Sequence, residues 1–389
     1  MKYDFDSVTP RRGTLSYKWD SAPEGVLPMW VADMDFKTAP AIIDALRKRV
    51  DNGIFGYTRV PDEYYDAVVS WFSRRHAWTI DRDMMIYTSG VVPAISAIIK
   101  ALANPGENVL VQTPVYNCFF SSIRNNGCVI LESPLVRNGD TYDIDFERLE
   151  KDTADPNTTL MLLCNPHNPA GRVWSREELK RIAEICSHNN VTVISDEIHC
   201  EFVFDGLHYT PFANVAEDTG CKAVVCVSPS KAFNIAGLQI ANIVAPDEET
   251  RARIDKAINI NEVCDVNPFG VIATIAAYNE GEEWLCQLLD YIKGNYEYMK
   301  DFCAKNLPDF PIAKLEATYL VWMDCTALGL KSEALEERLI EEVSLWLNAG
   351  TMYGTVDGEG YMRWNIACPR SVLTDGLNRF LSFTQKIKF

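Results

Sequence analysis

Residues 223–234, AVVCVSPSKAFN, join an apolar run to a turn that presents a single lysine. The run Ala223–Val227, bounded by Ser and Pro, predicts a buried strand that ends in that turn. Lysines usually lie on solvated surfaces, but Lys231 follows the C-terminal end of a predicted core strand, where α/β folds build their ligand sites. Ser228 and Ser230 place two hydroxyl groups beside it. This stretch therefore predicts an α/β fold with a ligand site at the end of the strand.

A lysine flanked by hydroxyl groups suits pyridoxal phosphate, which forms a Schiff base with one amine and needs an anchored phosphate. The short pattern Ser-x-Ser-Lys is equally compatible with a surface loop, so it does not establish the site alone. The rest of the chain has to support one of these two interpretations.

Composition indicates a globular protein that does not bind nucleic acid. The chain has 389 residues, 47% of them hydrophobic and 23% charged, which is typical of a soluble protein with room for two domains. Its formal net charge of −17 disfavours a nucleic-acid surface or docking on an anionic membrane. None of the 12 cysteines forms a Cys-x-x-Cys pair, and with 5 histidines no zinc-type spacing is present, so we expect no metal.

The sequence also bears on where the protein resides. Residues 1–6, MKYDFD, lack the apolar segment of a signal peptide. No apolar run approaches the roughly 20 residues that a membrane span needs. We therefore expect a soluble, cytoplasmic protein.

Strand and helix patterns alternate through the middle of the chain. Strands are predicted at 84–88, 108–111, 129–132, 159–164, 191–195, 223–227 and 239–244, with helices between most of them. Such alternation predicts right-handed βαβ units around a mostly parallel sheet.

After about residue 279 the pattern changes to long helices and few strands. Helices are predicted at 283–306, 333–346 and 372–386, and strands at 318–324 and 361–366. We expect an N-terminal segment, 1–50, that joins the small domain, a large cofactor-binding α/β domain, 51–280, and a small α+β domain, 281–389.

Four predicted strand ends carry different chemical groups. Ser89-Gly90-Val91-Val92 opens a helix whose backbone N–H groups form an anion seat, although a plain helix N-cap is the alternative. Asn165 begins a loop whose two prolines fix its shape, so its amide can point into the cleft. Asp196 ends a core strand and suits a pyridine nitrogen, and Tyr116 is placed to stack on a planar ring.

Several motifs together resemble those of a known family. NPHNPAG (165–171), SDEIH (195–199) and SPSKAFN (228–234) resemble motifs of the class I and II aminotransferase-fold enzymes, which are fold type I pyridoxal-phosphate enzymes. MWVADMDF (29–36), FNIAGLQ (233–239) and RWNIACPR (363–370) are similar to one branch, the MalY/PatB-type cystathionine β-lyases, or C–S lyases. The resemblance spans essentially the whole chain. It implies a mostly parallel seven-stranded sheet in a large domain, with a smaller α+β domain beside it.

The resemblance implies roles for particular residues. Lys231 would carry the cofactor and move the Cα proton, Asp196 would hold the pyridine nitrogen, and Tyr116 would stack on the ring; these three are the expected catalytic residues. The cofactor-binding residues implied are Gly90, Val91, Val92, Tyr116, Asn165, Asp196, His199, Ser228, Ser230, Lys231 and Tyr57.

The resemblance also implies that Arg363, Asn165 and Tyr57 line the substrate-binding part of the site. Arg363 would hold the substrate α-carboxylate in a bidentate pair. Asn165 would hydrogen-bond the phenolic oxygen of the cofactor. Tyr57 would reach the phosphate of a neighbouring subunit, so a homodimer is expected.

Two positions depart from the broader aminotransferase pattern. His199 stands where many members have Tyr, three positions after the Asp, and Gln239 stands where many have Arg, eight positions after the lysine. Both changes match the C–S lyase branch. The resemblance thus implies a β-lyase that cleaves cystathionine or cysteine S-conjugates to a thiol, pyruvate and ammonia. An amino-acid aminotransferase and a non-catalytic pyridoxal-phosphate-binding regulator are the alternatives.

Overall fold

A seven-stranded sheet forms the centre of the part of the chain that the computed structural model describes, residues 3–204, 206–262 and 266–387. Its order is β2 (Met85–Thr88), β10 (Ala241–Val244), β9 (Ala223–Val227), β8 (Thr192–Asp196), β7 (Thr158–Cys164), β3 (Asn108–Val111) and β4 (Val129–Glu132). The pairs from β9 to β4 are parallel, and β10 runs antiparallel to both neighbours. The predicted fold class is confirmed.

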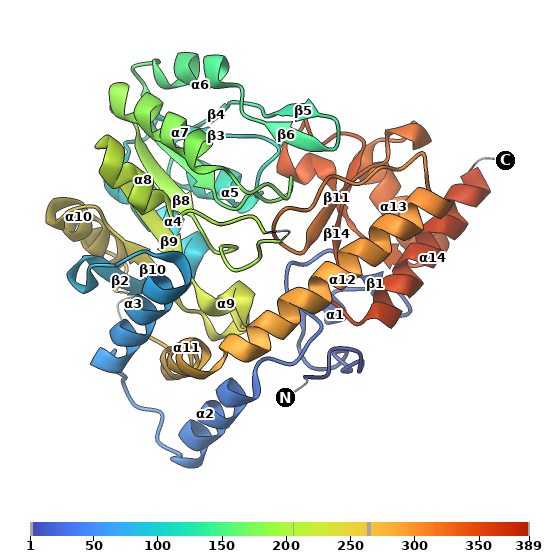
Figure 1. Ribbon diagram of the computed structural model, residues 1–389, viewed down its shortest axis with the longest axis horizontal. Helices are drawn as coiled ribbons and strands as arrows, with labels where there is room; N and C mark the ends of the chain where they lie inside the picture. The colour runs from blue at the N-terminus through green and yellow to red at the C-terminus, as the bar shows by residue number, and fades with distance from the viewer. Residues whose placement is uncertain (1–2, 205, 263–265, 388–389) are drawn as a thin grey trace.

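Helices cover both faces of this sheet because its strands alternate apolar side chains between two cores. On β7, Leu160 and Leu162 pack on one side, whereas Met161 and Leu163 pack on the other. The first face is covered by α4 (Val91–Leu102), α5 (Cys118–Asn125) and α10 (Glu248–Asn259), and the second by α6 (Phe146–Thr153), α7 (Arg176–His188) and α8 (Phe212–Thr219) (Figure 1). Burial on both faces explains why these strands read as continuous apolar runs.

A second, antiparallel sheet lies towards the C-terminus. It consists of β11 (Leu320–Asp324), β14 (Tyr361–Asn365) and β13 (Asn348–Ala349), in that order. The helices α12 (Glu282–Asn306), α13 (Ser332–Val343) and α14 (Arg370–Ile387) lie beside it in Figure 1. The N-terminal strand β1 (Leu27–Pro28) pairs in parallel with β12 (Leu345–Trp346), which ties the start of the chain to this part of the molecule.

The remaining elements connect these two sheets. They are the helices α1 (Tyr17–Asp20), α2 (Pro40–Asp51), α3 (Asp62–His76), α9 (Pro229–Ala232) and α11 (Pro268–Glu280), the hairpin of β5 (Val136–Asn138) and β6 (Thr141–Asp143), and short 3₁₀ turns at Arg82–Met84, Ala236–Leu238, Thr326–Leu328 and Gly350–Tyr353. No helix among the described residues has the length and apolar character that crossing a membrane requires.

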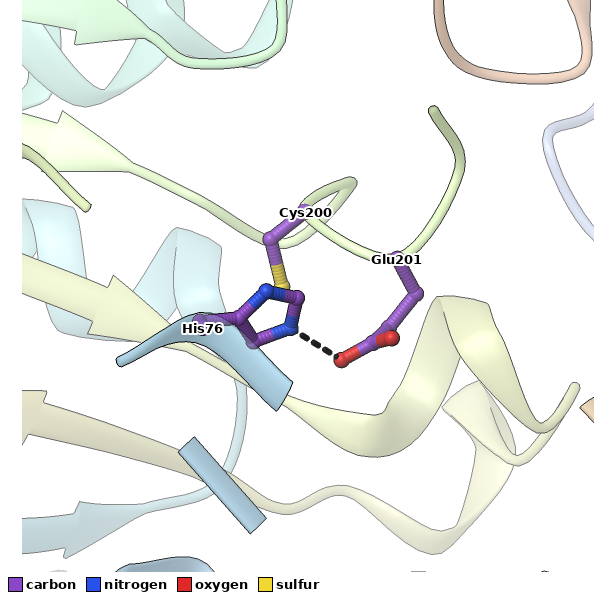
Figure 2. Close-up of side chains that lie close together, drawn as sticks. All are labelled: His76, Cys200 and Glu201. Carbon is purple, nitrogen blue, oxygen red and sulfur yellow. Dashed lines mark hydrogen bonds and ion pairs between the residues drawn. The ribbon is translucent and has the colours of Figure 1, made fainter. Parts of the chain in front are cut away.

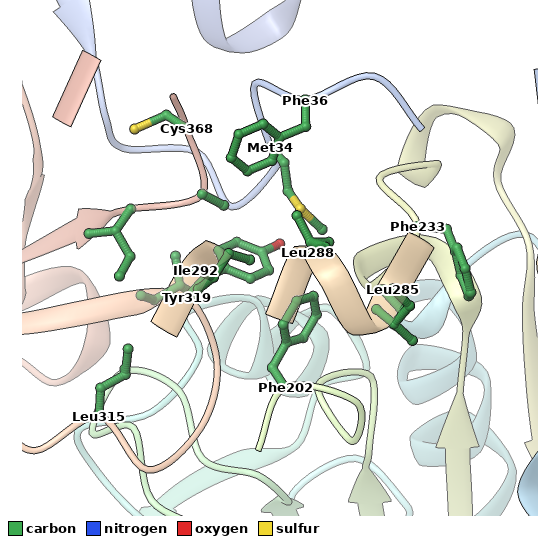
Figure 3. Close-up of a cluster of buried hydrophobic side chains, with 14 of the residues drawn as sticks. Met34, Phe36, Phe202, Phe233, Leu285, Leu288, Ile292, Leu315, Tyr319 and Cys368 are labelled. Carbon is green, nitrogen blue, oxygen red and sulfur yellow. The ribbon is translucent and has the colours of Figure 1, made fainter. Parts of the chain in front are cut away.

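One buried cluster brings distant parts of the chain together. Figure 3 shows side chains from the N-terminal segment (Met34, Phe36), from the loop after β8 (Phe202), from the turn after α9 (Phe233), from α12 (Leu285, Leu288, Ile292) and from just before β11 (Leu315, Tyr319). This packing holds the N-terminal segment against both sheets.

Two sequence-based expectations about elements need correction. The helix predicted at 333–346 ends at Val343, because Ser344 adopts a left-handed conformation with φ 54° and the next two residues form β12 against β1. The strand predicted from Gln239 begins at Ala241, since Gln239, with φ 53°, closes a 3₁₀ turn. Of the cysteines, Cys264 lies outside the described residues.

Candidate active site

A pocket of about 180 Å³ lies at the carboxyl ends of the parallel strands, where α/β sheets place their ligands. Cys164 and Asp196 are the last residues of β7 and β8, and both line it. Of the residues predicted from sequence, the pocket is lined by Gly90, Val91, Val92, Tyr116, Asp196, His199, Ser230 and Lys231. The structure thus brings together groups from five strand ends.

Lys231 lies in the short helix α9, directly after β9, so its side chain starts at the edge of the pocket. Its ammonium group donates a hydrogen bond of 2.6 Å to the carbonyl oxygen of Ala32. Burial and the nearby charge of Arg363 lower the pKa of Lys231 to about 8. With this pKa, about a tenth of the amine is uncharged at pH 7, which is the form that a nucleophile or base requires.

Asp196 and His199 provide an acidic and a neutral group at the same edge. Asp196 is buried and accepts a 3.1 Å hydrogen bond from the backbone N–H of Ile198, but burial dominates and raises its pKa to about 6. Burial and the charges of Lys231 and Arg363 lower the pKa of His199 well below its usual value. The imidazole is therefore neutral, and its Nδ1 atom has no hydrogen-bond partner among the described residues.

The N-terminus of α4 faces the pocket with backbone N–H groups. The first helical hydrogen bond runs from Ala94 N to Gly90 O, so the N–H groups of Val91 and Val92 precede any intrahelical acceptor. Gly90 has φ 156°, which L side chains rarely adopt, and within the described parts of the chain no side chain caps the helix. Free donors and the helix dipole make this end an anion site, with the hydroxyl of Ser230 beside it.

Arg363 adds a buried cation next to the pocket. It lies on β14 and is 3% exposed, with Nη1 donating to Asn168 Oδ1 at 3.2 Å and Nη2 donating to the carbonyl of Trp30 at 2.9 Å. Its guanidinium carbon lies 4.6 Å from the centre of the Tyr353 ring. The Nε atom has no partner among the described residues. A buried guanidinium with an unused N–H donor can bind a carboxylate.

Asn165 directly follows the lining residue Cys164 but does not itself line the pocket, whereas Asn168 does. The amide nitrogen of Asn165 donates to Glu197 at 3.2 Å and to the carbonyl of Thr210 at 3.0 Å, away from the lining residues. The side-chain oxygen of Asn165, Oδ1, is buried and has no hydrogen-bond partner among the described residues. Asn168 lines the pocket and contacts Arg363. Sequence reasoning missed it, although the loop contains both asparagines before prolines.

Three other predicted residues do not line this pocket. The hydroxyl of Ser228 donates to the carbonyl of Ile240 at 2.7 Å and accepts from the backbone N–H of Ser230 at 3.1 Å. It therefore caps α9, and its hydroxyl proton is already engaged in a hydrogen bond. Tyr57 is 98% exposed, on a loop that also exposes Ile54 and Phe55. Arg363 adjoins the pocket through Asn168 and is not itself part of its lining.

A group of three possible metal ligands lies elsewhere, where α3 meets the loop after β8. The ligand atoms of His76, Cys200 and Glu201 lie within 4.8 Å of one another (Figure 2). Glu201 already accepts hydrogen bonds from His76 (2.7 Å), Trp71 (2.6 Å) and Arg75 (2.8 and 2.9 Å). Burial acts to raise the pKa of Glu201, but these donors lower it overall. Because Arg75 supplies the cation, we interpret the group as a buried ion-pair network.

The pocket groups fit pyridoxal phosphate. The partly buried amine of Lys231 suits the aldehyde, the carboxylate of Asp196 suits a pyridine nitrogen, and the His199 Nδ1 atom, unpartnered among the described residues, suits a phenolic oxygen. Tyr116 offers an aromatic face, and the α4 N-terminus with Ser230 offers donors for a phosphate. Each part of the cofactor has a matching group.

Comparisons with known proteins agree with this chemistry. The sequence pattern of the family "Aminotransferase class I and II" matches residues 25–380. The chain is 44% identical over 381 residues to cystathionine β-lyase PatB of Bacillus subtilis, covering 97% of this chain and 98% of the relative. The structure of cystalysin from Treponema denticola, which contains pyridoxal 5′-phosphate, superposes with a TM-score of 0.96 at 35% identity over 100% of both chains. The pyridoxal-phosphate-bound C–S lyase of Staphylococcus hominis gives 0.91 at 34% identity over 98% of both chains.

Proposed function

Since the chain belongs to the family of class I and II aminotransferases, we propose that it is a pyridoxal-phosphate-dependent carbon–sulfur β-lyase. The likeness to a cystathionine β-lyase and to C–S lyases supports the reaction type. The substrates proposed are cystathionine and related cysteine S-conjugates, and the products are a thiol, pyruvate and ammonia.

The observation that carries the proposal is a partly buried lysine with a lowered pKa that lies close to Asp196 and Arg363. The pKa of about 8 for Lys231 results from burial first and from Arg363 second, while Asp33 and Asp196 act against it. Acidic and basic groups with shifted pKa values that lie close together are typical of catalytic sites. A surface lysine would not have these neighbours.

Each residue of the site has a separate role in the proposed reaction. Arg363 binds the α-carboxylate of the amino acid, and Asn168 holds the guanidinium in place. Pyridoxal phosphate, when bound, supplies an electron sink for the pair that remains when the Cα–H bond breaks. Lys231, once its amine is free, takes the Cα proton, and loss of the thiolate from Cβ follows. Asp196 keeps a pyridine nitrogen protonated, because a carboxylate beside that nitrogen favours its charged form.

Product analysis tests this function. The purified protein is incubated with L-cystathionine without any keto acid, and pyruvate, ammonia and thiol are measured. We expect all three in equal amounts, and Lys231→Ala should abolish their formation while leaving the fold intact by circular dichroism. Amino-group transfer that depends on an added keto acid, without pyruvate release, would contradict the lyase and support an aminotransferase.

We also propose a cytoplasmic homodimer in which Tyr57 reaches the neighbouring site. The loop at 54–57 supports this, because it exposes Ile54 (71%), Phe55 (58%) and Tyr57 (98%). Mixing inactive Tyr57→Ala and Lys231→Ala proteins tests it. Restored activity is expected, since one site of each mixed dimer would carry both native residues; a mixture that stays inactive while exchanging subunits would contradict it.

A further inference from the structure

The segment Met29–Phe36 is held in place by side chains from other parts of the chain. Asn348 donates to the carbonyl of Trp30 at 3.0 Å, and Asn365 donates to those of Val31 and Asp33 at 2.5 and 2.6 Å. Asn234, three residues after Lys231, donates to the carbonyls of Met34 and Phe36 at 2.9 and 2.8 Å. The segment is thus fixed on both sides of Ala32.

The carbonyl of Ala32 accepts two hydrogen bonds, one from the Lys231 amine and one from the Tyr319 hydroxyl. Lys231 Nζ donates to it at 2.6 Å, and the hydroxyl of Tyr319 donates to it at 2.9 Å. A carbonyl oxygen has two lone pairs, so it can accept both at once. Ala32 lines the pocket, whereas Tyr319 does not line it and adjoins it through this hydrogen bond and through a ring contact with His199, with ring centres 5.8 Å apart.

The position of the Tyr319 hydroxyl is fixed by packing. The ring is fully buried and makes a T-shaped contact with Phe202, with ring centres 4.8 Å apart. Figure 3 shows it among the side chains of the buried cluster, next to Ile292 of α12. Its backbone carbonyl accepts from Ile366 N at 3.0 Å. A ring held in this way can fix the carbonyl to which its hydroxyl donates.

We propose that Tyr319 is a positioning residue for Lys231 and acts through the carbonyl of Ala32. The inference rests on the proposed function, since it concerns the lysine that carries the cofactor and moves the proton. An uncharged Lys231 amine that donates one N–H to Ala32 has its lone pair in a defined direction. When Lys231 is instead bonded to the cofactor, Tyr319 still satisfies the buried carbonyl, which would otherwise lose its partner at a cost. The Ala32 acceptor therefore stays in place for the returning amine.

The test compares Tyr319→Phe with Tyr64→Phe in protein freed of cofactor. Tyr64 is a matched control, because it is also fully buried and donates one hydrogen bond, of 2.8 Å, to Asn242, outside the pocket. Pyridoxal phosphate is added, and covalent attachment is followed by absorbance. Binding of pyridoxine 5′-phosphate, which has no aldehyde, reports the noncovalent site separately.

We expect Tyr319→Phe to slow covalent attachment by about tenfold, because the carbonyl that positions the Lys231 amine loses one of its two hydrogen bonds. Affinity for pyridoxine 5′-phosphate should be unchanged, and Tyr64→Phe should change neither quantity. In the reconstituted enzyme, kcat for L-cystathionine should fall in Tyr319→Phe while KM is retained. Equal attachment rates in Tyr319→Phe and wild type, or equal slowing in both variants, would overturn the inference alone. Failure of the wild type to attach pyridoxal phosphate would overturn the proposed function and this inference with it.

Discussion

Replacing Asp196 by Asn should stabilise the cofactor-free protein even though it damages the site. Asp196 is 3% exposed, and its pKa is raised from 3.8 to about 6 chiefly by burial. A carboxyl whose pKa is higher in the folded state opposes folding as the pH rises, because the folded state binds its proton more tightly. Asn keeps the acceptor for the Ile198 N–H but carries no charge.

The size of the effect follows from the shift. About two pKa units correspond to about 3 kcal/mol at pH 8, where the charge penalty is complete, and to about 1.6 kcal/mol at pH 5. For a chain of this length, 3 kcal/mol raises Tm by about 4 °C. With pyridoxal phosphate bound the sign should reverse, because the carboxylate then has a cationic partner.

The assay is thermal and urea unfolding of both proteins after removal of the cofactor, at pH 5 and at pH 8. Asp83→Asn, which replaces an exposed carboxyl, serves as control and should change stability by no more than about 0.5 kcal/mol. A variant less stable than wild type at pH 8 would refute the reasoning. So would a stability gain that is the same at both pH values.

Three further substitutions test other parts of the structure. Arg363→Lys keeps the charge but loses the planar fork, so KM for L-cystathionine should rise about tenfold or more, with a smaller change in kcat, in steady-state assays. Asp35→Asn leaves Lys18, 1% exposed, without its 2.7 Å ion pair, and should cost about 3–5 kcal/mol in urea unfolding. Because the pKa of Asp35 is lowered overall, by Lys18 and other donors outweighing burial, this loss should be constant from pH 5 to 8 and shrink only below the usual aspartate value of 3.8. Glu201→Gln should cost about 1–3 kcal/mol, because the partly buried guanidinium of Arg75 keeps its ion pair with Glu282 but loses the one with Glu201. A chelator should leave the Tm of the wild type unchanged, and a chelator-induced drop would indicate a bound metal.

The central sheet could be predicted well from the sequence because its strands are marked by short, local sequence patterns. Strands buried on both faces have continuous apolar sequences, and Ser175 with Glu178 forms a capping box, a local sequence pattern, at the start of α7. Pairing between distant segments was not predictable in the same way. The short strand β12 exists because β1 lies beside it, about 300 residues earlier in the chain, and no local pattern distinguishes it from the end of a helix.

The same distinction applies to the pocket. Lys231 and Asp196 could be found because each follows a strand whose end is visible in the sequence. Asn168 was missed because the shape of a proline-rich loop decides which of its two amides points inward. The contact between Lys231 and Ala32 spans 199 residues and depends on the packing of Tyr319, so sequence reasoning alone does not reveal it.

Mapping the site of cofactor attachment tests the central claim most directly. The holoenzyme is reduced with borohydride, digested and analysed by mass spectrometry, with Lys231→Ala processed in parallel. The account predicts a pyridoxyl group on Lys231 and none in the variant. Attachment at a different lysine, or a wild-type protein that carries no such group after incubation with pyridoxal phosphate, would contradict it.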